Sequence, residues 1–239
     1  MKVTSLALDP IEKKPRVRFR PGSSVLSVGS VGCTMRCPWC QNHEIAQPDD
    51  PRRLKCKEVD TGDLVELALS CTDRGNIGLA YTYNEPLLRW RDVYCCAQAI
   101  HDAGLVNVVV TNGLLAKGKF EMLSERIDAF NIDLKGFDQS VYDVCGGKLD
   151  MVMENIALAA TSSHVEVTTL LIPGLNDDLR LIEKEAQWLS TIDPHITLHL
   201  TRFFPRFHYS DRIATPRSLM RSAAAAAREH LDDVVLGNI

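Results

Sequence analysis

The stretch "AFNIDLKGF", residues 129–137, shows most directly how this 239-residue chain folds. Two sets of residues alternate along it, the apolar Phe130, Ile132 and Leu134 and the polar Asn131, Asp133 and Lys135. Successive side chains of a β-strand point to opposite faces, so the stretch predicts a strand with one apolar and one polar face. We expect the apolar face to pack on helices.

The same division recurs in two later stretches, "HVEVTTLL" at 164–171 and "HITLHLTRF" at 195–203. The polar members there are Glu166, Thr168, Thr197, His199 and Thr201. Barrel interiors are usually filled by branched apolar side chains, and unpaired buried charge is costly. A polar inner face on three strands therefore predicts a ligand-filled cavity. The alternative is a set of satisfied polar residues on a solvent-facing sheet.

Strand-like and helix-like segments alternate through the chain. The predicted strands are 23–30, 78–84, 105–113, 129–136, 164–174, 195–203 and a short one in 234–239. The predicted helices are 61–75, 85–104, 117–126, 150–163, 177–191 and 215–233. This alternation predicts an α/β fold with a mainly parallel sheet, and its six units fit a partial (β/α)6 TIM-like barrel.

We expect one domain over residues 1–239. It is divided into an N-terminal segment (1–22), the partial-barrel core (23–212) and a C-terminal helix with a short strand (213–239).

Composition limits the classes of function. The formal net charge is −4, so no nucleic-acid partner is expected, and the basic run "KKPRVRFR" at 13–20 is interpreted as a solvated edge. No run approaches the roughly eighteen consecutive apolar residues of a membrane span. The start of the sequence lacks the pattern of a signal peptide. These features predict a cytoplasmic protein that does not enter a membrane and whose thiols are reduced.

Three of the eight cysteines, Cys33, Cys37 and Cys40, lie in the short stretch "VGCTMRCPWCQNHEIAQ" at 31–47. Three thiolates can hold three corners of a 4Fe-4S cluster and leave the fourth iron open. A zinc site completed by His43 is the alternative. The other five cysteines are scattered, and we interpret them mostly as small buried hydrophobic residues.

The loop, with an aromatic residue before its third cysteine, resembles the cluster loop of the radical S-adenosylmethionine (SAM) superfamily. Further motifs, in order, resemble the radical enzyme of the AmmeMemoRadiSam system, a group similar to pyruvate formate-lyase activating enzymes. These motifs are "DPIEKKP", "PGSSVLSVGSVGC", "CQN", "YTYNEP", "VVVTNG", "NIDLKGF", "LLIPGLND", "LHLTRFFP" and "LGNI". The resemblance covers nearly the whole chain.

The resemblance implies a 4Fe-4S cluster on Cys33, Cys37 and Cys40 and a SAM site beside it. By that implication, Asn84 and Glu85 bind the methionine amino group, and Thr111 and Asn112 contact methionine and ribose. Asp133 and Lys135 would hold the ribose hydroxyls and the methionine carboxylate. The adenine would be lined by Ile172, Pro173 and Gly174, with Trp39 packed against it. His199 and Arg202 are expected at the remaining cavity. An ordinary satisfied polar role for His199 is the alternative.

The implied activity is reductive cleavage of SAM to methionine and a 5'-deoxyadenosyl radical, which takes a hydrogen atom from the substrate. A low-potential flavodoxin or ferredoxin is the expected electron donor, and the substrate is an unidentified small molecule or protein. One alternative is a glycyl-radical-enzyme activating enzyme. Asn84 argues against it, because those enzymes carry a two-glycine version of the "YTYNEP" motif. An iron-sulfur electron carrier is the non-catalytic alternative.

Overall fold

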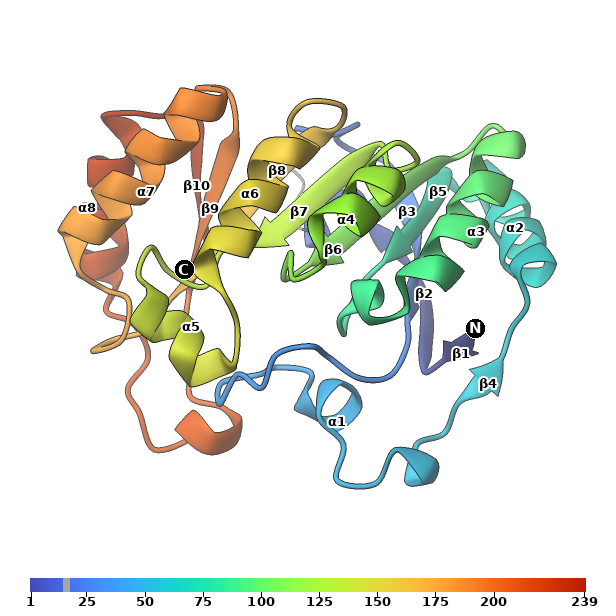
Figure 1. Ribbon diagram of the computed structural model, residues 1–239, viewed down its shortest axis with the longest axis horizontal. Coiled ribbons are helices and arrows are strands. Elements are labelled where there is room, and N and C mark those ends of the chain that lie inside the picture. The colour runs from blue at the N-terminus through green and yellow to red at the C-terminus, as the bar shows by residue number, and fades with distance from the viewer. Residues whose placement is uncertain (15–17) are drawn as a thin grey trace.

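An eight-stranded sheet forms the centre of the computed structural model, which describes residues 1–14 and 18–239 (Figure 1). Its strands are β2 (Ser5–Pro10), β3 (Ser24–Gly29), β5 (Asn76–Tyr81), β6 (Val106–Thr111), β7 (Ala129–Asp133), β8 (His164–Leu171), β9 (Thr197–Arg202) and β10 (Val234–Gly237). The strand order is β10-β9-β8-β7-β6-β5-β3-β2. Among the described strands of this sheet, β2 alone pairs antiparallel, against β3. The predicted α/β fold with a mainly parallel sheet is confirmed.

Helices follow the strands in the order that the sequence predicts. They are α2 (Thr61–Ser70), α3 (Trp90–Asp102), α4 (Lys117–Ser124), α5 (Gln139–Cys145), α6 (Leu149–Ala159), α7 (Leu179–Ile192) and α8 (Arg217–Arg228), with the one-turn α1 (His43–Ala46) before them. A separate two-stranded sheet pairs β1 (Lys2–Val3) with β4 (Lys57–Glu58). In Figure 1 the helices α3, α4, α6 and α7 lie along one side of the large sheet.

Strand β2 and helix α5 are among the elements that the sequence did not predict. Strand β2 lies inside the predicted N-terminal segment, where "SLALDP" alternates only weakly between apolar and polar residues. Helix α5 lies between β7 and α6 and is capped by Asp138, whose side chain accepts a hydrogen bond from the Ser140 N–H at 2.9 Å. Because it is only seven residues long, α5 shows too little of the 3.6-residue period to be recognised.

The two faces of the sheet differ as the alternation in 129–137 predicts. Phe130, Ile132 and Leu134 are fully buried in the main hydrophobic core, which also contains residues from the helices. On the other face, a small apolar cluster consists of Ile11, Val25, Ala80, Val108 and Ala129. Polar residues of β7, β8 and β9 continue that face beyond the cluster. Helices therefore cover one face, and the other is left for polar contacts.

The basic run 13–20 is not simply a solvated edge, so that interpretation is wrong for part of it. Lys14 is buried, and its ammonium lies 2.8 Å from the Asp9 carboxylate. Arg18 is exposed but forms two hydrogen bonds with Asp233. Residues 15–17 of the run lie outside the described residues.

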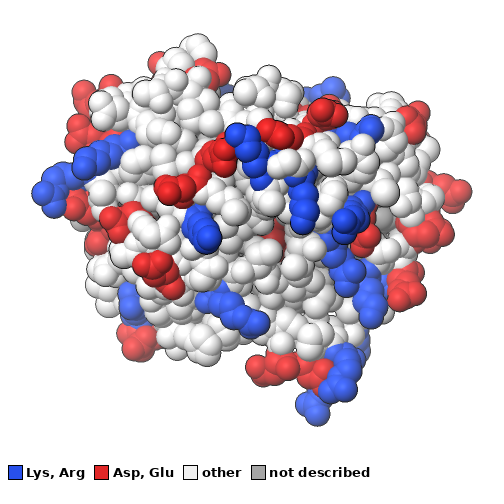
Figure 2. Space-filling view, viewed as in Figure 1, with Lys and Arg blue, Asp and Glu red and all other residues white. Residues whose placement is uncertain are grey.

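The surface in Figure 2 mixes charges of both signs without a large region of one sign. Within the described part of the chain, no helix combines the length and the apolar character needed to cross a bilayer.

Candidate functional site

The loop between β3 and α1 carries Cys33, Cys37 and Cys40, and two backbone hydrogen bonds fix its conformation. The Gly32 N–H donates to the Ile45 carbonyl at 2.9 Å, which closes the loop on itself. The Arg36 N–H donates to the carbonyl of Cys145 at 2.7 Å, which ties the loop to the end of α5. The element that the sequence did not predict thus supports the centre of the cysteine loop.

All eight cysteines are free thiols, and the three in the loop differ in their surroundings. The Cys33 sulfur accepts from the Met35 N–H at 3.3 Å and from the Asn112 side-chain amide at 3.6 Å. Burial, together with the nearby Glu85 carboxylate, raises the pKa of Cys33 to about 12. The pKa of Cys37 is raised by a contact with the Cys145 thiol and by burial. The thiols of Cys33 and Cys37 would therefore have to lose their protons when they bind a metal.

The described chain contains no cluster of three or more His, Cys, Asp or Glu side chains gathered closely enough to hold a single metal ion. His43, the fourth ligand in the zinc alternative, places Nδ1 3.2 Å from the Cys40 carbonyl and stacks its ring on Phe207. A cubane cluster needs thiolates at separated corners rather than around one ion. Three free thiols in one anchored loop are the donor set that a 4Fe-4S cluster with one open iron requires.

The other five cysteines were predicted to be mostly buried, and this holds for only some of them. Cys71, Cys96 and Cys145 are buried, and Cys56 is half-buried. Cys95 is exposed, so the prediction is wrong there. It lies on α3, whose buried residues are Val93, Cys96, Ala97 and Ile100.

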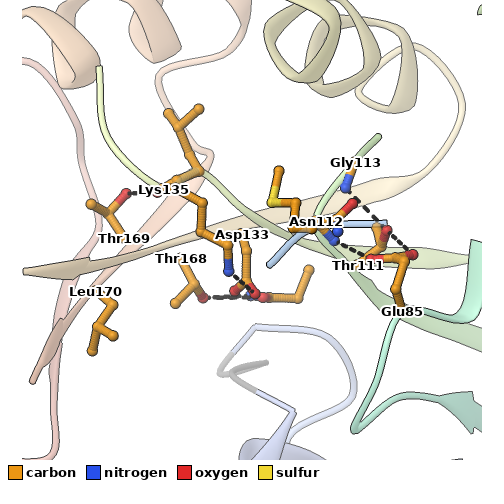
Figure 3. Close-up of polar contacts among 12 residues, drawn as sticks. Glu85, Thr111, Asn112, Gly113, Asp133, Lys135, Thr168, Thr169 and Leu170 are labelled. Atoms are coloured by element: carbon orange, nitrogen blue, oxygen red, sulfur yellow. Dashed lines mark hydrogen bonds and ion pairs between the residues drawn. The ribbon is translucent and has the colours of Figure 1, made fainter. Parts of the chain in front are cut away.

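Glu85 is at the centre of a hydrogen-bond network that joins the ends of β5 and β6 (Figure 3). Its carboxylate accepts from the Thr111 hydroxyl and the Asn112 N–H, each at 2.7 Å, and from the Leu87 N–H at 2.8 Å. Burial raises the pKa of Glu85 to about 7, although these three hydrogen bonds oppose the shift. The Asn112 amide also donates to the Thr34 hydroxyl at 2.9 Å, inside the cysteine loop.

Asn84 links the same network to the start of the cysteine loop. Its side-chain carbonyl accepts from the Ser30 N–H at 2.8 Å, and its side-chain amide donates to the Gly32 carbonyl at 2.9 Å. The structure therefore brings four of the predicted SAM-binding residues, Asn84, Glu85, Thr111 and Asn112, into one connected group beside Cys33.

Asp133 and Lys135 form an ion pair at the end of β7, with the ammonium 2.7 Å from the carboxylate (Figure 3). Burial by itself would lower the pKa of Lys135, but Asp133 and the Cys37 sulfur raise it well above its usual value. Next to the pair, the Asn131 side-chain amide donates to the Thr168 hydroxyl at 2.9 Å. The charged Lys135 ammonium and Asp133 carboxylate can bind the oppositely charged groups of a zwitterionic ligand.

The other predicted SAM contacts lie in different surroundings. Trp39 is buried, with its ring 5.6 Å from that of Tyr209. Ile172 is in the main core, and its N–H donates to the Asn176 side chain at 2.7 Å. Gly174 has a φ of 72°, a conformation that glycine adopts readily. The contacts of these residues with SAM remain predictions.

His199 has an internal partner. It is buried, and its Nε2 lies 2.5 Å from the Glu166 carboxylate. Glu166 also accepts from the Arg18 N–H at 3.1 Å and lies 2.9 Å from His164 Nε2. This geometry agrees with the satisfied polar role that the sequence left open for His199.

The contact of one segment with the cysteine loop was not predicted from the sequence. Residues 203–216, between β9 and α8, reach back to the cysteine loop, where the His208 N–H donates to the Pro38 carbonyl at 2.9 Å. The rings of Phe207 and Tyr209 lie against His43 and Trp39. The aromatic residues of "FFPRFHY" were a signal for this contact, but their partners lie far away in the sequence.

Comparison with known proteins identifies the family of the chain. The family model described as the radical SAM superfamily matches residues 27–184. The chain belongs to that superfamily, whose members are enzymes that bind a 4Fe-4S cluster and SAM.

Relatives by sequence come from archaea and bacteria. An uncharacterized protein of Methanocaldococcus jannaschii is 35% identical over 246 residues, covering 100% of this chain and 71% of the relative. The GTP 3',8-cyclase of Staphylococcus haemolyticus is 27% identical over 152 residues, covering 61% of this chain but only 45% of the cyclase.

Solved structures share the fold at low sequence identity. A domain of pyruvate-formate lyase-activating enzyme from Bacteroides vulgatus is 19% identical, with a TM-score of 0.59, and the match covers 67% of this chain and 99% of that domain. Streptococcus suis SuiB bound to S-adenosylmethionine is 14% identical, with a TM-score of 0.66, and the match covers 89% of this chain and 51% of SuiB. Below 25% identity these matches support the fold alone.

Proposed function

We propose that this chain is a radical SAM enzyme of the AmmeMemoRadiSam type. In this proposal Cys33, Cys37 and Cys40 hold a 4Fe-4S cluster, and the enzyme takes a hydrogen atom from a substrate that is not yet identified. The bound cluster would supply the electron that splits SAM into methionine and a 5'-deoxyadenosyl radical. The order of motifs along the whole sequence supports the AmmeMemoRadiSam type.

One observation carries the proposal. The Asn112 side chain contacts both the Cys33 sulfur and Thr34, while its backbone N–H donates to Glu85. The cysteine loop is thereby joined directly to the ends of β5 and β6. An open iron held by the loop would lie beside polar groups that can bind the amino and carboxylate groups of SAM.

The chain's own residues would bind and orient SAM. Lys135 supplies a cation for the methionine carboxylate, with Asp133 holding its ammonium in place. Asn84 and Glu85 stand at the end of β5, where backbone and side-chain oxygens can accept from the methionine amino group. Trp39 and the segment around Gly174 would enclose the adenine.

A low-potential flavodoxin or ferredoxin would deliver the electron, and the protein would act in the cytoplasm. The glycyl-radical activating enzyme remains the second candidate, because a solved domain with this fold belongs to a pyruvate-formate lyase-activating enzyme. The third candidate, an electron carrier, would have no use for the polar residues beside the cysteine loop.

The first experiment tests the cluster. We expect anaerobically reconstituted protein to release 5'-deoxyadenosine and methionine from SAM after reduction with dithionite. Cys33→Ala, Cys37→Ala and Cys40→Ala should each lose iron and the broad thiolate-to-iron absorbance. Cys56→Ala is the matched control and should keep both.

Loss of iron in Cys56→Ala together with retention in Cys37→Ala would refute the assignment of the ligands. A cluster that is reduced and reoxidised without any release of 5'-deoxyadenosine would favour the electron carrier instead.

A further inference from the structure

Tyr83, immediately before Asn84 and Glu85, has a backbone conformation that is unusual for a large side chain. Its φ is 73°, and the Asn84 N–H donates to the Thr82 carbonyl at 3.0 Å across it. These two features define a γ-turn of the rare, strained kind. A bulky non-glycine residue with positive φ is costly and persists only where its surroundings enforce it. Strain of this kind at the end of a strand calls for a functional explanation.

The "DPIEKKP" motif, which has no role in the proposed chemistry, contacts the side chain of Tyr83. The phenol donates to Asp9 Oδ2 at 2.6 Å, and the Lys14 ammonium lies 2.8 Å from the same oxygen. The ammonium is also 4.5 Å from the centre of the Tyr83 ring. Asp9 and Lys14 are only 7% and 3% exposed, so this charge pair is largely removed from water.

A buried ion pair adds little stability by itself, because desolvation of both charges offsets their attraction. Burial would raise the pKa of Asp9, yet the hydrogen bonds from Lys14 and Tyr83 hold it well below its usual value. The pair therefore presents a fixed, ionised acceptor to the phenol. A hydrogen bond to a charged acceptor is stronger than one between neutral groups.

The backbone of Tyr83 is held by the cysteine loop. The Asn42 side-chain amide donates to the Tyr83 carbonyl at 2.6 Å. Gly29 on β3 makes room for the ring, since a Cβ there would lie 2.9 Å from Tyr83 Cδ2. Tyr83 is thus fixed at its phenol, its ring and its carbonyl by three separate parts of the chain.

The strained turn sets the direction in which Asn84 and Glu85 leave β5. After the turn, the Glu85 N–H donates to the Gly32 carbonyl at 3.3 Å and its carboxylate reaches Thr111 and Asn112. A relaxed backbone at Tyr83 would turn the following two residues away from these partners.

We propose that Tyr83 is a positioning residue for SAM binding, held in its strained turn by the Asp9–Lys14 pair and by Asn42. The N-terminal motif acts through this turn on the presentation of Asn84 and Glu85. The inference rests on the proposed function, because it assigns these two residues to the methionine end of SAM.

The test compares Tyr83→Phe with Tyr94→Phe in protein reconstituted with its cluster. Each change removes one phenol hydroxyl, and the Tyr94 hydroxyl accepts a hydrogen bond from Arg126 at 3.0 Å. We expect Tyr83→Phe to raise the dissociation constant of SAM about tenfold with the iron content unchanged, as the loss of one charge-assisted hydrogen bond implies. Tyr94→Phe should leave SAM binding unchanged.

Two further measurements separate positioning from general stability. In cluster-free protein, the amide protons of Asn84, Glu85 and Leu87 should exchange with solvent faster in Tyr83→Phe than in the wild type. Asp9→Asn should weaken SAM binding, and the double variant Tyr83→Phe/Asp9→Asn should bind no more weakly than the worse single variant, because both changes break the same contact.

An unchanged SAM dissociation constant and unchanged exchange in Tyr83→Phe would overturn the inference, as would a lower melting temperature with normal SAM binding. Additive effects of the two changes would also overturn it. Failure of the proposed function is distinct, because the wild-type protein itself would then not bind SAM.

Discussion

Glu185 is the buried carboxyl of α7. It is 1% exposed, and the Thr169 hydroxyl lies 2.5 Å from its Oε1. Burial raises its pKa to about 8 from the usual 4.5, and the hydrogen bond with Thr169 only partly opposes this shift. Near neutral pH the folded protein therefore keeps a proton on Glu185.

Because the folded protein keeps this proton, we expect its stability to depend on pH. Between the unfolded pKa near 4.5 and the folded pKa of about 8, the folded state binds a proton that the unfolded state has released, so stability falls as pH rises. Near the lower end of this pH range we expect Glu185→Gln to be as stable as the wild type. At the upper end of the range the variant should be more stable than the wild type by roughly 1–3 kcal/mol. Chemical denaturation across this range measures the difference. Glu66→Gln, an exposed control on α2, should show no such pH-dependent gain.

Lys135 offers a test of the SAM contacts at the residue scale. Lys135→Met keeps most of the apolar stem but removes the charge, so SAM binding should weaken by about 2–3 kcal/mol, the loss of a charge-assisted contact. Equilibrium binding to reconstituted protein measures this loss. The control is Lys117→Met, which breaks an exposed ion pair with Glu154. It should leave SAM binding unchanged and change the stability of the protein by no more than about 1 kcal/mol. Equal SAM binding by Lys135→Met and the wild type would refute the assignment.

Glu85→Gln tests a different group at this scale. The carboxylate of Glu85 accepts three internal hydrogen bonds, so the amide leaves one donor without its acceptor. We expect a loss of about 1–3 kcal/mol in stability as well as weaker SAM binding. Thermal unfolding of cluster-free protein reports the first effect separately from the second. Unchanged stability would show that the network at the ends of β5 and β6 contributes little.

At the scale of elements, the packing of β5 against β6 depends on Gly78. A Cβ at this position would lie 1.9 Å from the Val106 carbonyl oxygen, and Gly78 pairs with Val106 in the parallel register. Backbone cannot move aside as a flexible side chain can. Gly78→Ala should therefore destabilise the protein by about 3 kcal/mol or more, through displacement of one strand.

The control for Gly78 lies in helix α4. A Cβ added at Gly118 would meet no atom within 4 Å, so Gly118→Ala should stabilise the protein by up to about 1 kcal/mol through helix propensity. Denaturant unfolding of both variants measures the contrast. Similar stability of the two would contradict the register of β5 and β6.

At the scale of the whole molecule, the second candidate function predicts a different reaction partner. An activating enzyme acts on a glycine in a large protein, whereas the substrate of the proposed enzyme is not yet identified. We expect slow SAM cleavage by the reconstituted enzyme alone and no glycyl radical after incubation with a pyruvate formate-lyase homologue. Anaerobic electron paramagnetic resonance of the mixture is the measurement. A glycine-centred doublet formed in proportion to 5'-deoxyadenosine would place the activating enzyme first.

The sequence by itself determined the fold class and the position of the cysteine loop. Alternation in 129–137 fixes which residues face the helices, because side-chain direction along a strand depends only on a two-residue period. The six β/α units follow from the order of local patterns. The three cysteines within one loop likewise needed no tertiary information, because their spacing is local.

Only the tertiary structure decided how distant residues meet. The phenol of Tyr83 reaches Asp9 across 74 positions, and the amide of Asn112 reaches Cys33 across 79. The burial of Lys14 and the pairing of His199 with Glu166 also depend on neighbours from other strands. Local periodicity carries no information on such partners, because strand order and register are set by packing of the whole sheet.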